Sequence, residues 1–266
     1  MKRSASRGRV WFERLVKGGM HVEGLPASVL ACDTTIGDAP VRAIAVVPDP
    51  AARFERARNG EVGIDEGFGL AVAVNGTPQG SAILAIVDVP GQAFGVKEEA
   101  AGLQRALAAS TQAYVRARRG GHPVLALVVG KAISGAFLAH GLQAGWIGAL
   151  DDAAIEVHVM SEAAVARVTR MERNELARVA REIPATARDI RTFAQLGAID
   201  RLFAVSDAAN PTDADVSRIA DALAEVLRTP QLGLRNPVER LEVPAANATR
   251  ALARRVRAAL LDGWNA

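Results

Sequence analysis

The stretch that decides the fold is 124–139, with the sequence VLALVVGKAISGAFLA. Its first six residues, 124–129, form a continuous apolar run, which predicts a buried strand. The run ends at Gly130-Lys131, and small residues then lead into a helix that we expect to begin near Ser134 and to reach about Gln143. Six apolar residues are too few to span a membrane, so the run indicates the core of a sheet.

Apolar runs and helical patterns alternate on both sides of this stretch. Two short runs at 28–32 and 41–47 flank a turn-rich segment, 33–40, and predict a hairpin. Further strands are expected at 82–89, 146–150 and 154–159. Helices are expected at 61–75, 97–118, 161–195 with a break at Pro184, and 213–227. Strands that alternate with helices predict an α/β fold with a largely parallel sheet.

Length and composition narrow the class of protein. The chain has 266 residues, half of them hydrophobic and 23% charged, which excludes a disordered or fibrous protein. A net charge of +3 and 4% aromatic residues give no nucleic-acid footprint. A single cysteine, Cys32, excludes an internal disulfide and a cysteine-cluster zinc site, and the four histidines show no metal-ligand spacing. No apolar segment of a secretory signal follows the basic first residues, so we expect a cytoplasmic protein without a membrane anchor.

The last part of the chain, 231–266, follows a break rich in Pro, Gly and Asn and is expected to be a helical extension of a single domain spanning 1–266. Its final helix carries apolar and basic residues on opposite faces by the 3.6-residue period. The apolar face holds Leu252, Val256 and Leu260, and the basic face holds Arg250, Arg254 and Arg257. The arginines fit a solvated face or a docking surface for an acidic partner, and the pattern leaves both open.

Common α/β enzyme motifs are absent. A phosphate-binding loop needs GxxxxGK followed by Ser or Thr, and here Gly130-Lys131 is followed by Ala132. A serine hydrolase needs GxSxG, whose spacing Ser134 does not have, and no GxGxxG follows a strand.

The turn Ser134-Gly135-Ala136 is the candidate for chemistry. Backbone N–H groups at the start of a helix have no partner within the helix and lie at the positive end of its dipole. Small side chains there would let a ligand oxygen approach, which makes a candidate oxyanion hole. The alternative is that Ser134 caps the helix and that Gly135 and Ala136 allow close packing on the sheet.

The neighbouring motifs resemble the carboxyl-terminal half of the biotin-dependent carboxyltransferases. The resemblance lies in Val87-Asp88-Val89-Pro90-Gly91, in Glu99 with Gly102, and in Lys131-Ala132 followed by Gly135-Ala136, over about 80–205. Upstream, 46–50 and 53–63 closely resemble the gamma subunits of biotin-independent malonate decarboxylases, a likeness that covers almost the whole chain. The resemblance implies a crotonase-like (ClpP/crotonase) fold of repeated β-β-α units with surrounding helices.

The family resemblance also implies a function. Members act with a beta subunit to decarboxylate a malonyl thioester, carried by an acyl-carrier (delta) subunit with a coenzyme-A-like group, to the acetyl thioester and CO2. An alpha subunit, the acyl-carrier transferase, completes the complex, and no cofactor is bound covalently to the gamma chain. The N–H groups of Gly135 and Ala136 are then the candidate donors to the enolate or the departing carboxylate. The candidate substrate-binding residues are Ser134, Lys131, Gly91 and Gly95.

Other polar residues keep two interpretations. Asp88 fits a group that fixes the following turn or a catalytic group. Lys131 fits a ligand of the malonyl carboxylate or a surface residue. His140 fits a packed side chain better than a catalytic one. Cys32 is expected to be buried and inert. The arginines Arg53, Arg56 and Arg58 fit a solvated cluster or contacts to the partner or to carrier phosphates. A chain of this length has room for one carboxyltransferase half, and the rival functions are a subunit of a biotin-dependent carboxylase and a non-catalytic scaffold.

Overall fold

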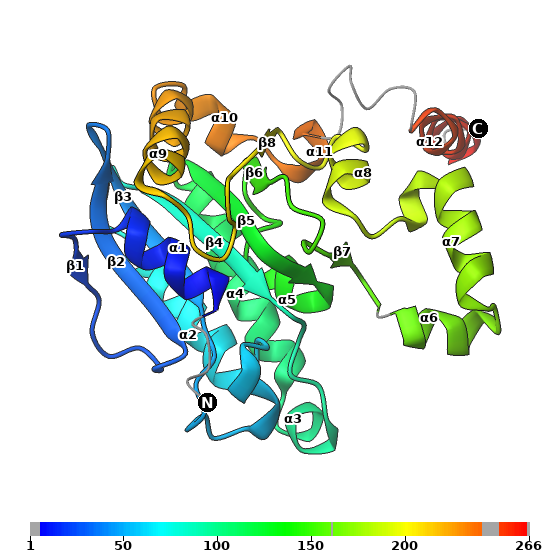
Figure 1. Cartoon of the computed structure of the whole chain (residues 1–266), viewed down its shortest axis with the longest axis horizontal. Coiled ribbons are helices and arrows are strands. Elements are labelled where there is room, and N and C mark those ends of the chain that lie inside the picture. Colours follow the sequence, from blue (N-terminus) through cyan, green and yellow to red (C-terminus); the bar gives the residue numbers. More distant parts are fainter. Residues whose placement is uncertain (1–5, 161, 241–249, 265–266) are drawn as a thin grey trace.

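A computed structural model describes residues 6–160, 162–240 and 250–264, and its centre is a mixed sheet (Figure 1). The strand order is β1-β2-β3-β4-β5-β6-β8, with β7 pairing with β5. The first three strands are antiparallel and every pair from β3 onward is parallel, as expected. The strands are β1 (Met20–His21), β2 (Val29–Ile36), β3 (Ala39–Val46), β4 (Ala82–Val89), β5 (Val124–Ile133), β6 (Trp146–Leu150), β7 (Val157–His158) and β8 (Arg201–Phe203).

Helices cover both faces of this sheet. Figure 1 shows α1 (Arg7–Leu15) and α9 (Asp213–Leu227) in front of the sheet, and α2 (Ile64–Asn75), α4 (Leu103–Arg119) and α5 (Ser134–Ala139) behind it. On the front face, Trp11 and Phe12 of α1 are fully buried, and the Trp11 Nε1–H donates to the Ala208 carbonyl at 2.8 Å. The sheet is therefore buried on both faces, which explains the continuous apolar runs of β4 and β5.

The predicted elements are confirmed in outline and corrected in detail. The bounds of β4, β6 and α9 agree with the sequence analysis, and 28–47 is a hairpin. Its turn is shorter than expected because the strands pair as far as Ile36 and Ala39, and Arg42 bridges to Asp33 across them. The helix expected at 97–118 is two helices, α3 (Val96–Ala100) and α4, because Gly102 between them has φ +96°.

Four further expectations differ from the structure in length or continuity. The strand expected at 124–129 continues to Ile133, because Ala132 and Ile133 pair with β7. The helix after it ends at Ala139, just before Gly141 with φ +115°, and the strand expected at 154–159 is only β7. The expected helical region 161–195 is α6 (Glu162–Thr169), α7 (Arg173–Glu182), the 3-10 turn η2 (Pro184–Thr186) and α8 (Ile190–Gln195). Neither α1 nor β8 was expected.

The last described helices are α10 (Pro230–Leu234), α11 (Pro237–Arg240) and α12 (Ala251–Trp264). The apolar face expected on α12 is open, since Leu252, Val256 and Leu260 are all more than half exposed. Helices α6, α7 and α12 have no buried residue. No helix among the described residues is long and apolar enough to cross a membrane.

The Asp88 carboxylate ties together the ends of β4 and β5. Its Oδ1 accepts from the Lys131 N–H at 3.1 Å, and its Oδ2 accepts from the Gly8 N–H of α1 at 3.0 Å. The register of β4 against β5 shifts between Val87 and Val89, which is where the carboxylate reaches across. Asp88 therefore has the structural role, fixing the backbone around it, that was one of its two interpretations.

We expect Asp88→Ala to lower the free energy of unfolding by about 1–3 kcal/mol, because two backbone N–H groups lose their acceptor. Asp88→Asn keeps one acceptor oxygen, so its free energy of unfolding should lie between that of Asp88→Ala and that of the wild type. Chemical denaturation measures the stability of both variants. The control is Asp38→Ala in the exposed hairpin turn, which should change the free energy of unfolding by about 0.5 kcal/mol or less. Wild-type stability in Asp88→Ala would contradict this structural role.

Candidate active site

The strand β5 runs directly into the helix α5 at Ser134. Ser134 has φ +58°, in the left-handed region that residues other than glycine rarely adopt. Ile133 occupies the N-cap position and no side chain caps the helix, so the interpretation of Ser134 as a capping residue was wrong. Strained backbone of this kind collects at functional sites, and here it sets the direction in which α5 leaves the sheet.

The loop after β4 forms the facing wall. Gly91 has φ +148°, a conformation that suits glycine, and its carbonyl accepts from the Val62 N–H at 2.9 Å. The Val62 carbonyl accepts in turn from the Ala93 N–H at 2.9 Å. These two bonds hold Gln92 between them, so its side chain has a fixed place beside α5.

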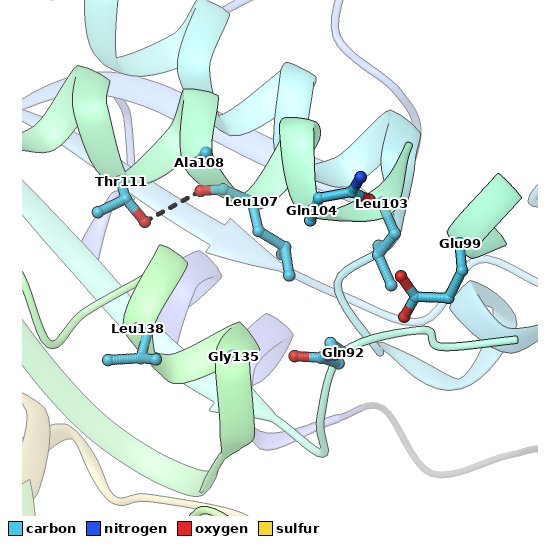
Figure 2. Close-up of a pocket in the computed structure, with 9 residues that line it drawn as sticks. All are labelled: Gln92, Glu99, Leu103, Gln104, Leu107, Ala108, Thr111, Gly135 and Leu138. Atoms are coloured by element: carbon cyan, nitrogen blue, oxygen red, sulfur yellow. Dashed lines mark hydrogen bonds between the residues drawn. The ribbon is translucent and has the colours of Figure 1, made fainter. Parts of the chain in front are cut away.

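A cavity of about 290 Å³ lies between this loop, α4 and α5. Figure 2 shows Gln92 with its Oε1 directed toward Gly135, and Glu99 at the far end of the cavity. A Cβ added at Gly135 would overlap that Oε1, so the two residues are as close as a glycine allows. The lining residues are Gln92, Glu99, Leu103, Gln104, Leu107, Ala108, Thr111, Gly135 and Leu138. The cavity lies at the carboxyl ends of parallel strands, where α/β proteins commonly bind ligands.

The structure brings together only part of the predicted site. Gly135 lines the cavity and Gly91 adjoins Gln92, whereas Ala136 is fully buried beneath the helix start. Lys131 is exposed and does not line the cavity, and a Cβ at Gly95 would overlap the Glu98 carboxylate.

Sequence reasoning missed the polar lining residues Gln92, Gln104 and Thr111. Gln92 had a signal, because it is a polar residue in a loop that follows a buried strand. Gln104 and Thr111 had no such signal, because they are polar residues within a helix. Only the packing of α5 beside α4 shows that they line a cavity.

A buried hydrogen-bond chain holds α4 and α5 in place around the cavity. The Tyr114 hydroxyl donates to His140 Nδ1 at 2.9 Å, and the His140 Nε2–H donates to the Ile86 carbonyl at 3.0 Å. Ser110 Oγ donates to the Ala139 carbonyl at 2.7 Å. Burial lowers the pKa of His140 to about 4 and raises the pKa of Tyr114. His140 is therefore neutral, and it is packed inside the fold, as expected.

The arginine cluster adjoins the loop of Gln92. Arg56 lies over the exposed Phe94 ring, with its guanidinium 5.3 Å from the ring centre, and Arg53 pairs with Asp65 at 2.7 Å. Arg58 donates to the Ala52 carbonyl. Each of the three arginines therefore contacts a group of this chain.

Two further expectations concern thiol and metal chemistry. Cys32 is buried, as expected, and burial is the main cause of the raised pKa of its thiol. Within the described residues, no three His, Cys, Asp or Glu side chains form a group that could hold a metal ion.

Comparison with known proteins identifies the family. The profile of the malonate decarboxylase gamma subunit family, MdcE, matches residues 57–264. The chain belongs to this family. A curated relative, the malonyl-S-ACP:biotin-protein carboxyltransferase MADD of Malonomonas rubra, is 36% identical over 160 residues. That match covers 56% of the chain and only 55% of the relative, so the chain spans about half of its length.

Solved structures agree with this assignment. A Pseudomonas malonate decarboxylase hetero-tetramer in complex with coenzyme A has a chain that is 44% identical, with a TM-score of 0.87, covering 95% of this chain and 99% of that one. The Pseudomonas MdcD-MdcE hetero-dimer matches with a TM-score of 0.81 and 44% identity over 98% and 100% of the two chains. Transcarboxylase 12S, at 22% identity and a TM-score of 0.63, covers 85% of this chain and 43% of that one and shows the fold alone. The predicted crotonase-like carboxyltransferase fold is thus confirmed.

We expect the stability of the fold to fall in mild acid because His140 must stay neutral. Its pKa is about 4 in the folded chain and about 6.5 unfolded, so only the unfolded chain gains the proton between these values. The contribution of His140 to the free energy of unfolding should therefore be full above pH 6.5, fall by about 1.4 kcal/mol per pH unit between pH 6.5 and pH 4, and change no further below pH 4.

Urea denaturation at several pH values measures this slope. His140→Gln should lower stability and flatten the slope, whereas His122→Gln, which leaves His140 in place, should retain it. An NMR titration of wild-type His140 that found it protonated at pH 6 would contradict the account.

Proposed function

We propose that this chain is the gamma subunit of a biotin-independent enzyme that decarboxylates a malonyl thioester on an acyl-carrier protein, giving the acetyl thioester and CO2. The observation that carries the proposal is the cavity in which Gly135, at the strained start of α5, lies beside Gln92. Family membership supplies the reaction class, and this cavity is where a thioester oxygen can reach the main chain.

Loss of CO2 leaves an electron pair on C2 of the malonyl group, which delocalises as an enolate onto the thioester oxygen. The Gly135 and Ala136 N–H groups, at the positive end of α5, are the donors that would stabilise that charge. Ala136 is buried below the cavity, so the Gly135 N–H is the more accessible of the two. An aligned donor of this kind is typically worth about 3–4 kcal/mol in the transition state.

The remaining substrate contacts follow from the same geometry. Ser134 sets the angle of α5, and Gly91 holds the loop that presents Gln92. Gln92 is then placed to bind the carbonyl or carboxylate of the malonyl group. Lys131, exposed on β5, is proposed to attract that carboxylate before it enters the cavity, and Gly95 leaves room for the Glu98 carboxylate.

The relatives support one of the proposed partners. The Pseudomonas hetero-dimer of MdcD and MdcE supports a beta-type partner for this chain, and the coenzyme A of the hetero-tetramer supports a carrier group of similar chemistry. We propose that the acyl-carrier (delta) subunit delivers the malonyl group, that the alpha subunit loads the carrier, and that the complex works in the cytoplasm. No cofactor is proposed to be bound covalently to this chain.

We expect the isolated chain to be catalytically silent and its mixture with the beta-type partner to release CO2 from a malonyl-carrier thioester. We propose that one carboxyltransferase half supplies one wall of the substrate site, and a relative of this chain forms a hetero-dimer. Release of CO2 by each subunit and by the mixture measures this. Full turnover by the single chain, or by the partner without it, would contradict the proposal, and the second result would favour a scaffold.

A second candidate is carboxyl transfer to biotin, which the name of the Malonomonas rubra relative favours. Both reactions cleave the same C–C bond and differ in the acceptor, which is a proton or biotin. Avidin treatment of the reconstituted complex separates them. Unchanged CO2 release supports the decarboxylase, and strong inhibition would support the transferase.

We expect Gly135→Val to lower the rate of decarboxylation by about 10²-fold or more, because the side chain blocks the approach to the aligned donor. An added Cβ meets the end of the Gln92 side chain and a methyl of Leu107, and its three nearest atoms include no backbone atom, so folding and assembly should survive. Melting temperature, complex formation and rate are measured on the same variant.

The control is Gly263→Val in α12, where an added Cβ has nothing within 4 Å. This variant should retain the wild-type rate. A Gly135→Val complex that assembles normally and turns over at the wild-type rate would remove Gly135 from the mechanism.

A further inference from the structure

The candidate cavity has two ends that differ in chemistry. Its lining on α4 runs from Leu103 to Thr111, which is about 12 Å of helix because each residue rises by about 1.5 Å. Figure 2 shows Glu99 beside Leu103 at one end, the acidic end, and Leu138 below Thr111 at the other, the neutral end. Among the described residues that line the cavity, Glu99 is the only one with an ionisable side chain.

Gly135 lies near the middle of this length. A Cβ built on Gly135 would be 3.4 Å from a methyl carbon of Leu107, which is halfway along the lining of α4. About 6 Å of helix therefore extends to either side of Leu107. A thioester oxygen bound at the Gly135 N–H has the acidic end of the cavity on one side and the neutral end on the other.

The carboxylate of Glu99 is available to a ligand. The residue is exposed, and its side chain has no hydrogen bond or ion pair with any other residue that the structure describes. Its backbone is fixed, because its N–H donates to the Gly95 carbonyl at 2.8 Å and its carbonyl accepts from the Gly102 N–H at 3.1 Å. The chain thus holds a charged acceptor at this end of the cavity and does not use it.

A malonyl thioester also has two unlike ends. One end is a carboxylate, and the other is the carrier arm, in which a coenzyme-A-like group has two methylene groups and then an amide N–H after the sulfur. Four single bonds separate the thioester carbonyl carbon from that amide nitrogen, which is about 5 Å in an extended chain. With the thioester oxygen at Gly135, this N–H therefore reaches whichever end of the cavity the arm enters.

The charge of Glu99 distinguishes the two directions of binding. Two carboxylates in one small cavity repel each other, and a repulsive contact selects between binding modes as an attractive one does. An amide N–H instead donates to a carboxylate, and hydrogen bonds to an ionised group are stronger than those between neutral groups.

We propose that Glu99 accepts a hydrogen bond from the first amide N–H of the carrier arm and thereby directs the malonyl carboxylate to the neutral end. This role rests on the decarboxylase function proposed above. Glu99 belongs to the motifs that carry the family resemblance, which gave it no role.

The first experiment uses the complex reconstituted with the beta-type partner and a malonyl-carrier thioester. We expect Glu99→Leu to lower kcat/KM by about 10-fold or more, because a hydrogen bond to a charged group is lost. Glu99→Gln keeps an acceptor oxygen without the charge, so its kcat/KM should fall by a smaller factor. Glu23→Leu is the matched control, since Glu23 is exposed between β1 and β2 and does not line the cavity, and it should behave as wild type.

Two small thioesters test the amide contact itself. The malonyl thioester of N-acetylcysteamine contains the first amide of the arm, and the S-(4-oxopentyl) thioester replaces only its N–H with a methylene group. The wild-type complex should prefer the amide compound by about 10-fold or more, and Glu99→Leu should treat the two alike. Each compound is assayed as a substrate and as an inhibitor of carrier-thioester turnover, so that binding without turnover is also detected.

The outcomes separate the two proposals. A wild-type complex that releases no CO2 from the malonyl-carrier thioester refutes the decarboxylase function itself. An active wild-type complex without a preference for the amide compound, or a Glu99→Leu complex that keeps the preference, overturns the role of Glu99 alone. Equal losses with both small thioesters, or failure of Glu99→Leu to assemble with the partner, would also overturn it, because Glu99 would then act on the site or on the partner and not on the arm.

Discussion

The parallel pairing of β4 with β5 is the interaction on which the rest of the structure depends. Both strands are buried on both faces, and their carboxyl ends emerge side by side from the core. The loop that holds Gln92 follows β4, and α5 follows β5. The pairing of the two strands therefore brings this loop and α5 together. The Asp88 carboxylate holds the point where the register shifts and ties α1 to the same place.

The cavity depends on the absence of a side chain at one position. Gly135 lies against Gln92 so closely that even a methyl group would displace the amide. Behind it, the chain from Tyr114 through His140 to the Ile86 carbonyl fixes α4 and α5 without any charged group. A rigid neutral support beneath an accessible N–H suits stabilisation of a developing negative charge, because the donor need not reorganise during the reaction.

Local sequence determined the elements whose ends are set by their own residues. The strand β4 ends before Pro90, and α9 begins at Asp213, after Thr212, which caps the helix through a reciprocal bond with Asp215. The strand β5 could not be bounded in this way, because Gly130-Lys131 reads as an end and only the pairing with β7 carries the strand to Ile133. For the same reason the polar wall of the cavity was invisible in the sequence, since tertiary packing alone brings Gln104 and Thr111 opposite Gly135.

The central claim is that the thioester of the substrate is held at the start of α5, and a structure of the assembled complex tests it most directly. The complex with the beta-type partner would be crystallised with a malonyl-thioester analogue that cannot lose CO2. The account predicts that the thioester oxygen lies about 2.7–3.1 Å from the Gly135 nitrogen, with Gln92 beside it. A thioester bound outside this cavity, with the Gly135 N–H left to solvent, would contradict it.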